Sequence, residues 1–302
     1  MKVVLFCGGL GTRLREYSDT VPKPMVNIGP RPIIWHLMKY YAHYGHTEFI
    51  LCLGYRGELI KEYFLNYDEC VSNDFELVGG KEVRLYGRDI DQWRITFAET
   101  GLTSNIGQRL TAVRHYLDDD DVFLANYSDG LTDLDLTDYL EHFRRRDTIG
   151  SFVCVHPSQS FHAVSVAADG LVRDLRPAVD SNLWINGGFF AFKREIFDYL
   201  RDGEELVLEP FQRLIAREQL VAYPHEGFWA CMDTFKDKQA FDDMHARGDT
   251  PWQVWRTPAD GRRRPAAVEP VARRIHAGMT VEPHPNGVHG PVLTAVPASA
   301  ER

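Results

Sequence analysis

The hydrophobic positions of this chain form short apolar runs that alternate with segments of helical spacing. The runs at 3–6, 49–53 and 122–125 are typical of strands that are buried on both faces of a sheet. Between the first two runs, the apolar residues of 33–41 recur at the spacing of a helix. A second helix is predicted after the second run, at 58–65. This strand–helix rhythm predicts an α/β fold with a mostly parallel sheet and right-handed crossovers.

The pattern is less regular in two later parts of the chain. Residues 66–93 lead through Gly79-Gly80 into two alternating stretches, near 82–87 and 93–98, which predict an inserted hairpin or flap. From residue 149 onward helices become fewer, and strands separated by turns are predicted near 149–155, 162–167, 170–175 and 184–192. We therefore divide the folded part of the chain into residues 1–148 and 149–256.

The composition changes again after Arg256. Residues 257–302 contain many prolines and alanines, few large apolar side chains and the basic run 262–264. Such a segment cannot bury enough apolar surface to fold on its own. We expect it to be a disordered or loosely attached tail.

The first apolar run ends in a glycine-rich loop. Three glycines within four positions are followed by a hydroxyl and a guanidinium, in the order Gly8, Gly9, Gly11, Thr12 and Arg13. Glycines at the end of a strand let backbone N–H groups approach a phosphate closely. Lys23 lies between two prolines, which restrict the backbone and so position its side chain. These features predict a site for a nucleoside triphosphate at the carboxyl edge of the sheet.

Two other interpretations of this loop remain open. A plain tight turn with two surface cations needs no ligand, although it does not explain why the lysine is held between prolines. A dinucleotide-binding loop, as in an oxidoreductase, nearly fits G-x-G-x-x-G from Gly9, but Leu14 occupies the last glycine position. The strand at 49–53 is also followed by no carboxylate that could hold a ribose.

The ordered set of motifs along the chain is much more specific than any one of them. After the 8–14 loop come Pro22-Lys23-Pro24-Met25, Tyr127-Ser128-Asp129-Gly130, Asn186-Gly187-Gly188-Phe189-Phe190, Phe228-Trp229 and Met232-Asp233-Thr234. This set resembles the sugar-1-phosphate nucleotidyltransferases, and in particular their glucose-1-phosphate cytidylyltransferase branch, over roughly residues 1–256. The resemblance implies a Rossmann-like three-layer fold with a mostly parallel central sheet and a smaller sugar-side β-sheet. It also implies a nucleotide-binding half at 1–148 and an acceptor-binding half at 149–256.

The resemblance implies an enzyme that transfers a cytidylyl group from CTP to a sugar-1-phosphate, with α-D-glucose 1-phosphate as the expected acceptor. Its catalytic residues would be Arg13 and Lys23. The expected nucleotide-binding residues are Leu10, Gly8, Gly9, Gly11, Thr12, Thr103, Arg109 and Ser128. The expected acceptor-binding residues are Arg176, Asn186, Gly187 and Glu209.

The cofactor that we expect is Mg²⁺, bound by Asp129 and Asp233. Asp129 follows a buried strand and precedes a glycine, which places its carboxylate well for a hard cation. Asp233 matches the second metal ligand of the resembled family. Another interpretation is a catalytically inactive relative that serves as a binding or regulatory subunit. It is weaker than an active enzyme, because the two carboxylates, Arg13 and Lys23 are all present.

Two departures from the family pattern leave the substrate open to alternatives. Leu175 and Arg176 stand where the family commonly has Glu-Lys, and Gln108 stands where it often has glycine. Leucine cannot accept hydrogen bonds from sugar hydroxyls, whereas arginine can still hold a phosphate. The alternative is nucleotidyl transfer to a different phosphate or phosphonate acceptor, or from a different nucleoside triphosphate.

The overall composition narrows the cellular setting. A net charge of −9 over 302 residues argues against broad nucleic-acid binding, which requires a basic surface. The five cysteines form no C-x-x-C pair and are typical of reduced thiols, with Cys7 packed at the end of the first strand. No signal peptide or long apolar span is evident, so we expect a cytoplasmic enzyme without membrane contact. The resembled family also leads us to expect a homo-oligomer.

Overall fold

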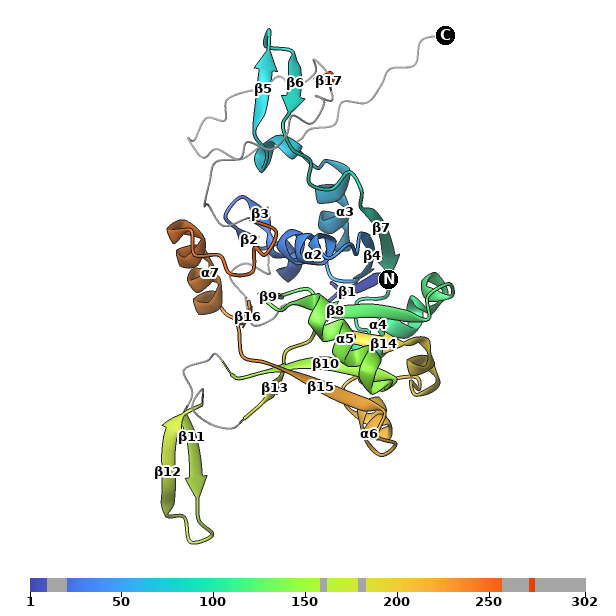
Figure 1. Cartoon of the computed structure of the whole chain (residues 1–302), viewed down its shortest axis with the longest axis vertical. Helices are drawn as coiled ribbons and strands as arrows, with labels where there is room; N and C mark the ends of the chain where they lie inside the picture. Colours follow the sequence, from blue (N-terminus) through green and yellow to red (C-terminus); the bar gives the residue numbers. More distant parts are fainter. Residues whose placement is uncertain (10–20, 158–161, 179–182, 257–271, 275–302) are drawn as a thin grey trace.

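A mixed eight-stranded sheet forms the centre of the computed structural model, which describes residues 1–9, 21–157, 162–178, 183–256 and 272–274. The strand order is β13-β10-β14-β8-β1-β4-β7, and β15 pairs with β10 (Figure 1). These strands are β1 (Val3–Phe6), β4 (Glu48–Leu53), β7 (Arg94–Glu99), β8 (Val122–Tyr127), β10 (Gly150–Val155), β13 (Ile185–Asn186), β14 (Phe190–Lys193) and β15 (Leu220–His225). The sheet therefore includes strands from both halves of the chain.

The strand β1 lies at the middle of the parallel part of the sheet. Val3 pairs with Phe49 of β4 on one side and with Leu124 of β8 on the other, both in parallel register. β4 is in turn parallel to β7. The carboxyl ends of these four strands therefore meet at one edge, where the chain crosses from one side of β1 to the other and ligands commonly bind.

Two apolar layers cover the two faces of the sheet. Successive residues of a strand point to opposite faces, so Val3 and Leu5 pack in one layer while Val4 and Phe6 pack in the other. The first layer includes α2 (Ile33–His43), α3 (Gly57–Leu65), α5 (Leu136–Arg146) and α7 (Phe235–Arg247), and the second includes α4 (Ile106–Ala112) and α6 (Glu209–Ile215). This arrangement confirms the three-layer α/β fold that the sequence predicts.

Two hairpins project from opposite ends of the molecule (Figure 1). They are β5 (Phe75–Val78) with β6 (Glu82–Leu85), and β11 (His162–Val166) with β12 (Val172–Pro177). The inserted hairpin that the sequence predicts in this region forms, but 93–98 is not the partner of 82–87. Gly79 and Gly80 have φ of 58° and 70°, which folds β6 back on β5, while Arg94–Glu99 joins the central sheet as β7.

The remaining elements are short. They are β2 (Asn27–Ile28), β3 (Arg31–Pro32), β9 (Gly130–Thr132), β16 (Trp229–Cys231), β17 (Ala272–Arg274) and the 3₁₀ turns η2 (Lys23–Met25), η3 (Glu69–Val71), η4 (Arg114–Leu117) and η6 (Arg194–Asp198). β17 pairs with β6, and the rest of the predicted 257–302 tail lies outside the described residues. Cys7 is 1% exposed and packs in the first layer, as expected. No helix in the described part of the chain is long and apolar enough to cross a membrane.

Candidate active site

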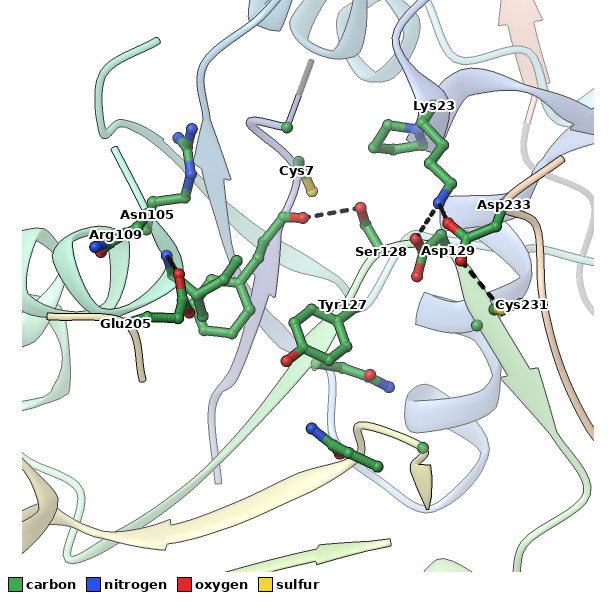
Figure 2. Close-up of a pocket in the computed structure, with 18 of the residues that line it drawn as sticks. Cys7, Lys23, Asn105, Arg109, Tyr127, Ser128, Asp129, Glu205, Cys231 and Asp233 are labelled. Carbon is green, nitrogen blue, oxygen red and sulfur yellow. Dashed lines mark hydrogen bonds and ion pairs between the residues drawn. The ribbon is translucent and has the colours of Figure 1, made fainter. Parts of the chain in front are cut away.

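A cavity of about 630 Å³ lies at the carboxyl edge of the sheet (Figure 2). It is lined by residues that follow β1 and β8, by η2, by the start of α4, and by β13 and β16. Its size is in the range found for small-molecule and cofactor sites. Many of the residues that the sequence predicts for the site line this cavity, namely Gly9, Lys23, Arg109, Ser128, Asp129, Asn186, Gly187 and Asp233.

One lysine and two aspartates form the charged centre of this cavity. Lys23 Nζ lies 2.5 Å from Asp129 Oδ2 and 2.6 Å from Asp233 Oδ1 (Figure 2). Burial favours a lower pKa for Lys23, but the charges and hydrogen bonds of the two carboxylates outweigh it and raise this pKa. The ammonium therefore remains charged between two carboxylates.

Three separate elements bring these groups together. Lys23 begins η2 after Pro22, whose φ is −65°, so the two flanking prolines set the backbone of the lysine. Asp129 follows β8 closely. The small sheet of β9 and β16 pairs Gly130 with Cys231, and the N–H of Met232 donates to the Asp129 carbonyl at 2.9 Å. This pairing carries Asp233 to the side of Asp129.

The two carboxylates fit the chemistry that Mg²⁺ requires. Magnesium prefers oxygen ligands and is usually held by one or two carboxylates together with waters and substrate phosphates. The partly buried Lys23 ammonium bonds to both carboxylates, so their oxygens are close enough together to hold one cation between them. No group of three or more His, Cys, Asp or Glu side chains suited to a metal occurs among the described residues, so the substrate and water would complete the coordination.

Arg109 holds the ends of three parallel strands together. Its side chain donates hydrogen bonds to the carbonyls of Gly8 at 3.0 Å, Leu53 at 3.1 Å and Gly101 at 2.9 Å, and to Thr100 Oγ1 at 2.7 Å. These acceptors follow or end β1, β4 and β7, and the arginine is only 2% exposed. The residue that the resemblance assigns to the nucleotide thus lines the cavity while its guanidinium bonds to the protein backbone.

Glycines after these strands make room for the guanidinium. A Cβ on Gly8 would lie 2.0 Å from Arg109 Nη1, and a Cβ on Gly54 would lie 2.7 Å from the Gly8 carbonyl oxygen. Gly9 differs, since it is exposed and lines the cavity, and a Cβ added there would meet no atom of the described residues within 4 Å. Within this part of the structure, Gly9 leaves its backbone open to a ligand, whereas Gly8 is required by the packing of Arg109.

Asn186 and Gly187 also line the cavity. Asn186 Oδ1 accepts from the N–H of Gly188 at 2.9 Å, and the Gly187 carbonyl accepts from Trp229 Nε1 at 2.9 Å. The prediction of one buried strand through this segment was wrong. β13 ends at Asn186, because Gly188 and Phe189 have φ of 77° and 50° and turn the chain before β14.

Several predicted site residues lie elsewhere in the described part of the chain. Arg176 is exposed on β12 of the projecting hairpin, where Nε lies 2.5 Å from Asp174 Oδ2. Glu209 is exposed at the first turn of α6, and Thr103 is exposed beside the cavity-lining Ser104. The structure does not bring these three predicted residues to the cavity. Leu10, Gly11, Thr12 and Arg13 lie outside the described residues.

The structure places a carboxylate in the cavity that the sequence did not indicate. Glu205 lines the wall away from Lys23, and its Oε2 accepts from the N–H of Ile106 at 3.4 Å (Figure 2). Its loop packs closely on α4, since a Cβ on Gly107 would lie 2.3 Å from the Glu204 carbonyl oxygen. A glycine in the first turn of a predicted helix indicates such a close approach, but it does not identify the segment that approaches.

Tyr127 lies between Glu205 and Asp129 in the cavity (Figure 2). Burial, and then the charges of Glu205 and Asp129, raise the pKa of its phenol to about 12, although the side chain of Asn186 opposes the change. The phenol therefore stays protonated at neutral pH and offers a hydroxyl donor to a ligand. The sequence motif at 127–130 includes this tyrosine but indicates no role for it.

The side chain of Gln108 caps the start of α4. Its side-chain oxygen accepts from the N–H of Asn105 at 3.1 Å, and Asn105 Oδ1 accepts from the N–H of Gln108 at 2.8 Å. This capping box starts α4.

Ser128 lines the cavity but bonds to the protein backbone. Its hydroxyl donates to the Phe6 carbonyl at 2.9 Å and joins the ends of β8 and β1.

Comparisons with known proteins agree with this fold. A family model described as nucleotidyl transferase matches residues 2–238. The glucose-1-phosphate cytidylyltransferase of Salmonella typhimurium is 37% identical over 258 residues, which cover 84% of this chain and 100% of that protein. The probable glucose-1-phosphate cytidylyltransferase of Bacillus subtilis is 38% identical over the same shares.

A solved structure of UDP-glucose pyrophosphorylase in complex with UDP-glucose superposes with a TM-score of 0.61. It is 13% identical and covers 82% of this chain and 98% of its own, a likeness that concerns the fold alone. The family model spans residues that include β1, Lys23, Asp129 and Asp233, and each of the two cytidylyltransferase relatives matches 84% of the chain. The chain belongs to the nucleotidyl transferase family.

Proposed function

We propose that this protein is a glucose-1-phosphate cytidylyltransferase, which converts CTP and α-D-glucose 1-phosphate into CDP-glucose and pyrophosphate. The observation that carries the proposal is the Lys23 ammonium between Asp129 and Asp233, inside a cavity at the carboxyl edge of the sheet. Support comes from relatives of that name, which are 37–38% identical to this chain over their whole length.

The proposed reaction is a nucleotidyl transfer at phosphorus. An oxygen of the acceptor phosphate forms a bond to the α-phosphorus of CTP, and the bond from that phosphorus to the bridging oxygen of the β-phosphate breaks. Pyrophosphate leaves with the electron pair. The acceptor phosphate is already ionised at neutral pH, so the reaction needs no general base. The main obstacle is to hold two anions together, and positioning and electrostatics overcome it.

The residues of the cavity have different roles in this reaction. Lys23 supplies positive charge to the reacting phosphates, and the open backbone of Gly9 approaches the triphosphate. Asp129 and Asp233 would hold Mg²⁺, which when bound supplies further positive charge to the phosphates. Arg13, outside the described residues, is the group that we propose for the leaving pyrophosphate.

The acceptor would bind against Tyr127, Asn186, Gly187 and Glu205. A phenol, an amide and a carboxylate match the hydroxyl groups of a sugar, since they offer both donors and acceptors. Neither family departure lies on this wall, because Gln108 caps α4 and Leu175 and Arg176 belong to the projecting hairpin. We therefore keep glucose 1-phosphate as the acceptor to test first.

A panel of substrates tests the proposed function directly. Purified protein with Mg²⁺ and glucose 1-phosphate is incubated with CTP, UTP, GTP, ATP or dTTP, and pyrophosphate release is measured. We expect release with CTP well above release with the other nucleotides. Release with a different nucleotide would contradict the proposed donor, and no release with any nucleotide would contradict the proposed acceptor.

Replacing Glu205 by glutamine tests the acceptor wall. A carboxylate makes a stronger hydrogen bond to a hydroxyl than a neutral amide does, by about 1 kcal/mol, so the KM for glucose 1-phosphate should rise roughly five- to tenfold. The KM for CTP should change less than about twofold, as measured by steady-state kinetics with each substrate varied in turn. Glu209→Gln is the matched comparison, because the family resemblance favours that residue. A rise in acceptor KM for Glu209→Gln alone would contradict our assignment.

We also propose that the protein is a homo-oligomer and lies in the cytoplasm. Exposed apolar side chains on the projecting β11–β12 hairpin support a contact with another subunit, namely Val164, Val166, Val172 and Leu175. The five cysteines all lie in the described part of the chain and none is in a disulfide there, which suits a reducing compartment.

A further inference from the structure

We propose that Lys23 occupies the divalent-cation position in the nucleotide-free protein, and that it must leave this position before the cation can bind. The inference rests on the proposed function, which brings a triphosphate and a divalent cation to the cavity. It concerns the order of these events and the role of the lysine before the reaction begins.

The contacts of Lys23 place it where the cation would bind. Its ammonium bonds to one oxygen of each carboxylate, at 2.5 Å on Asp129 and 2.6 Å on Asp233. Magnesium–oxygen bonds are about 2.1 Å long, so an ion on either of these oxygens would lie within about 4.7 Å of Nζ. The side chains of Lys23, Asp129 and Asp233 are only 15%, 23% and 26% exposed. Water would therefore screen the repulsion between the ammonium and the metal ion poorly.

The charges of these groups also favour exchange over joint occupancy. The two carboxylates and the ammonium sum to −1, so the lysine already neutralises half of the negative charge that would attract a divalent cation. An ammonium that leaves the carboxylates needs another anion nearby. The third carboxylate that lines the cavity, Glu205, lies on the wall away from Lys23, whereas a triphosphate would bring anionic groups beside it.

The backbone of Lys23 restricts where the ammonium can go. Pro22 and Pro24 hold the residue at the start of η2, while the four-carbon side chain remains flexible. The ammonium can therefore move within the cavity without movement of the chain. We infer that it exchanges the carboxylates for a phosphate when the cation and the nucleotide arrive. Cation and nucleotide should consequently bind cooperatively, since each favours the same position of the lysine.

Manganese binding to the nucleotide-free protein tests this inference, measured from the paramagnetic resonance signal of free Mn²⁺. We expect Lys23→Gln to bind Mn²⁺ at least about tenfold more tightly than the wild-type protein. Lys61→Gln is the matched control, because it removes the same charge from a surface pair with Glu99 and should bind like the wild type. Adding Asp129→Asn to Lys23→Gln should remove the gain, which places the ion on this carboxylate.

Equal Mn²⁺ affinity of Lys23→Gln and wild type would overturn the inference. An equal gain in Lys61→Gln, or a gain that survives Asp129→Asn, would overturn it as well. Circular dichroism checks the fold of each variant, and Lys23→Met replaces the glutamine variant if that one does not fold. A crystal structure of the wild type with Mn²⁺ and CTP gives a measurement without any variant, and Lys23 still bonded to both carboxylates there would refute the exchange.

The outcome is separable from that of the proposed function. Pyrophosphate release by the wild-type protein judges the reaction, whereas Mn²⁺ affinity without nucleotide judges the position of Lys23. A protein that releases pyrophosphate from CTP but shows no gain in Lys23→Gln keeps its function and loses this inference. A gain in Mn²⁺ affinity without pyrophosphate release would support the cation position and contradict the reaction.

Discussion

Asp129→Asn should lower kcat by about three orders of magnitude while the protein keeps its fold. The substitution keeps the shape of the side chain but removes the negative charge that would hold the cation beside the reacting phosphates. A loss of about 4 kcal/mol of transition-state stabilisation corresponds to roughly a thousandfold in rate. Steady-state pyrophosphate release at saturating CTP, glucose 1-phosphate and Mg²⁺ measures it.

The fold should survive because the Asp129 side chain is partly exposed. The hydrogen bond from the Met232 N–H is accepted by the Asp129 backbone carbonyl, which the substitution does not change. Asp147→Asn is a suitable control. Asp147 is exposed at the C-terminal end of α5 with φ of 52°, a conformation that asparagine also adopts readily. Near wild-type turnover in Asp129→Asn with Mg²⁺ supplied would contradict its assignment as a metal ligand.

Arg109→Met should reduce both stability and activity. The guanidinium is the donor for the carbonyls of Gly8, Leu53 and Gly101, and methionine would leave these groups without it. Losing several charge-assisted hydrogen bonds at a buried site should lower the free energy of unfolding by roughly 3–5 kcal/mol. The midpoint of urea denaturation should shift to a clearly lower concentration, and turnover should fall because the loop at Gly8 loses its support.

Arg94→Met separates the loss of this network from the loss of a positive charge. The side chain of Arg94 is 81% exposed and pairs at the surface with Glu48, so its replacement should change stability by less than about 1 kcal/mol. If Arg109→Met were as stable as the wild type and raised only the KM for CTP, Arg109 would act mainly on the nucleotide, as the family resemblance implies.

Some of the predicted features depend only on neighbouring residues, and these agree with the structure. The apolar run of β1 and the helical spacing of α2 are local patterns, and both elements form where they were expected. Lys23 is positioned by the prolines on either side of it. Asp129 reaches the carboxyl edge simply because it follows a buried parallel strand.

Other features depend on which segments pack together, and sequence patterns did not identify them. The register of the β5–β6 hairpin followed from a turn at two glycines, and strand alternation alone had favoured a different partner for β6. Glu205 enters the cavity because its loop packs on Gly107, while Glu209, at the start of the next helix, does not line it. Neither outcome is encoded in the spacing of nearby residues.

The sequence by itself determined the α/β class, the family, the strand ends that build the cavity, and the lysine and aspartates at its centre, because each depends on local patterns or on an ordered set of motifs. Only the tertiary structure decided that Arg109 ties three strand ends together and that Lys23 lies between two carboxylates. These contacts join residues far apart in the chain, through sheet register and close glycine packing. Their geometry therefore exists only once the layers are assembled.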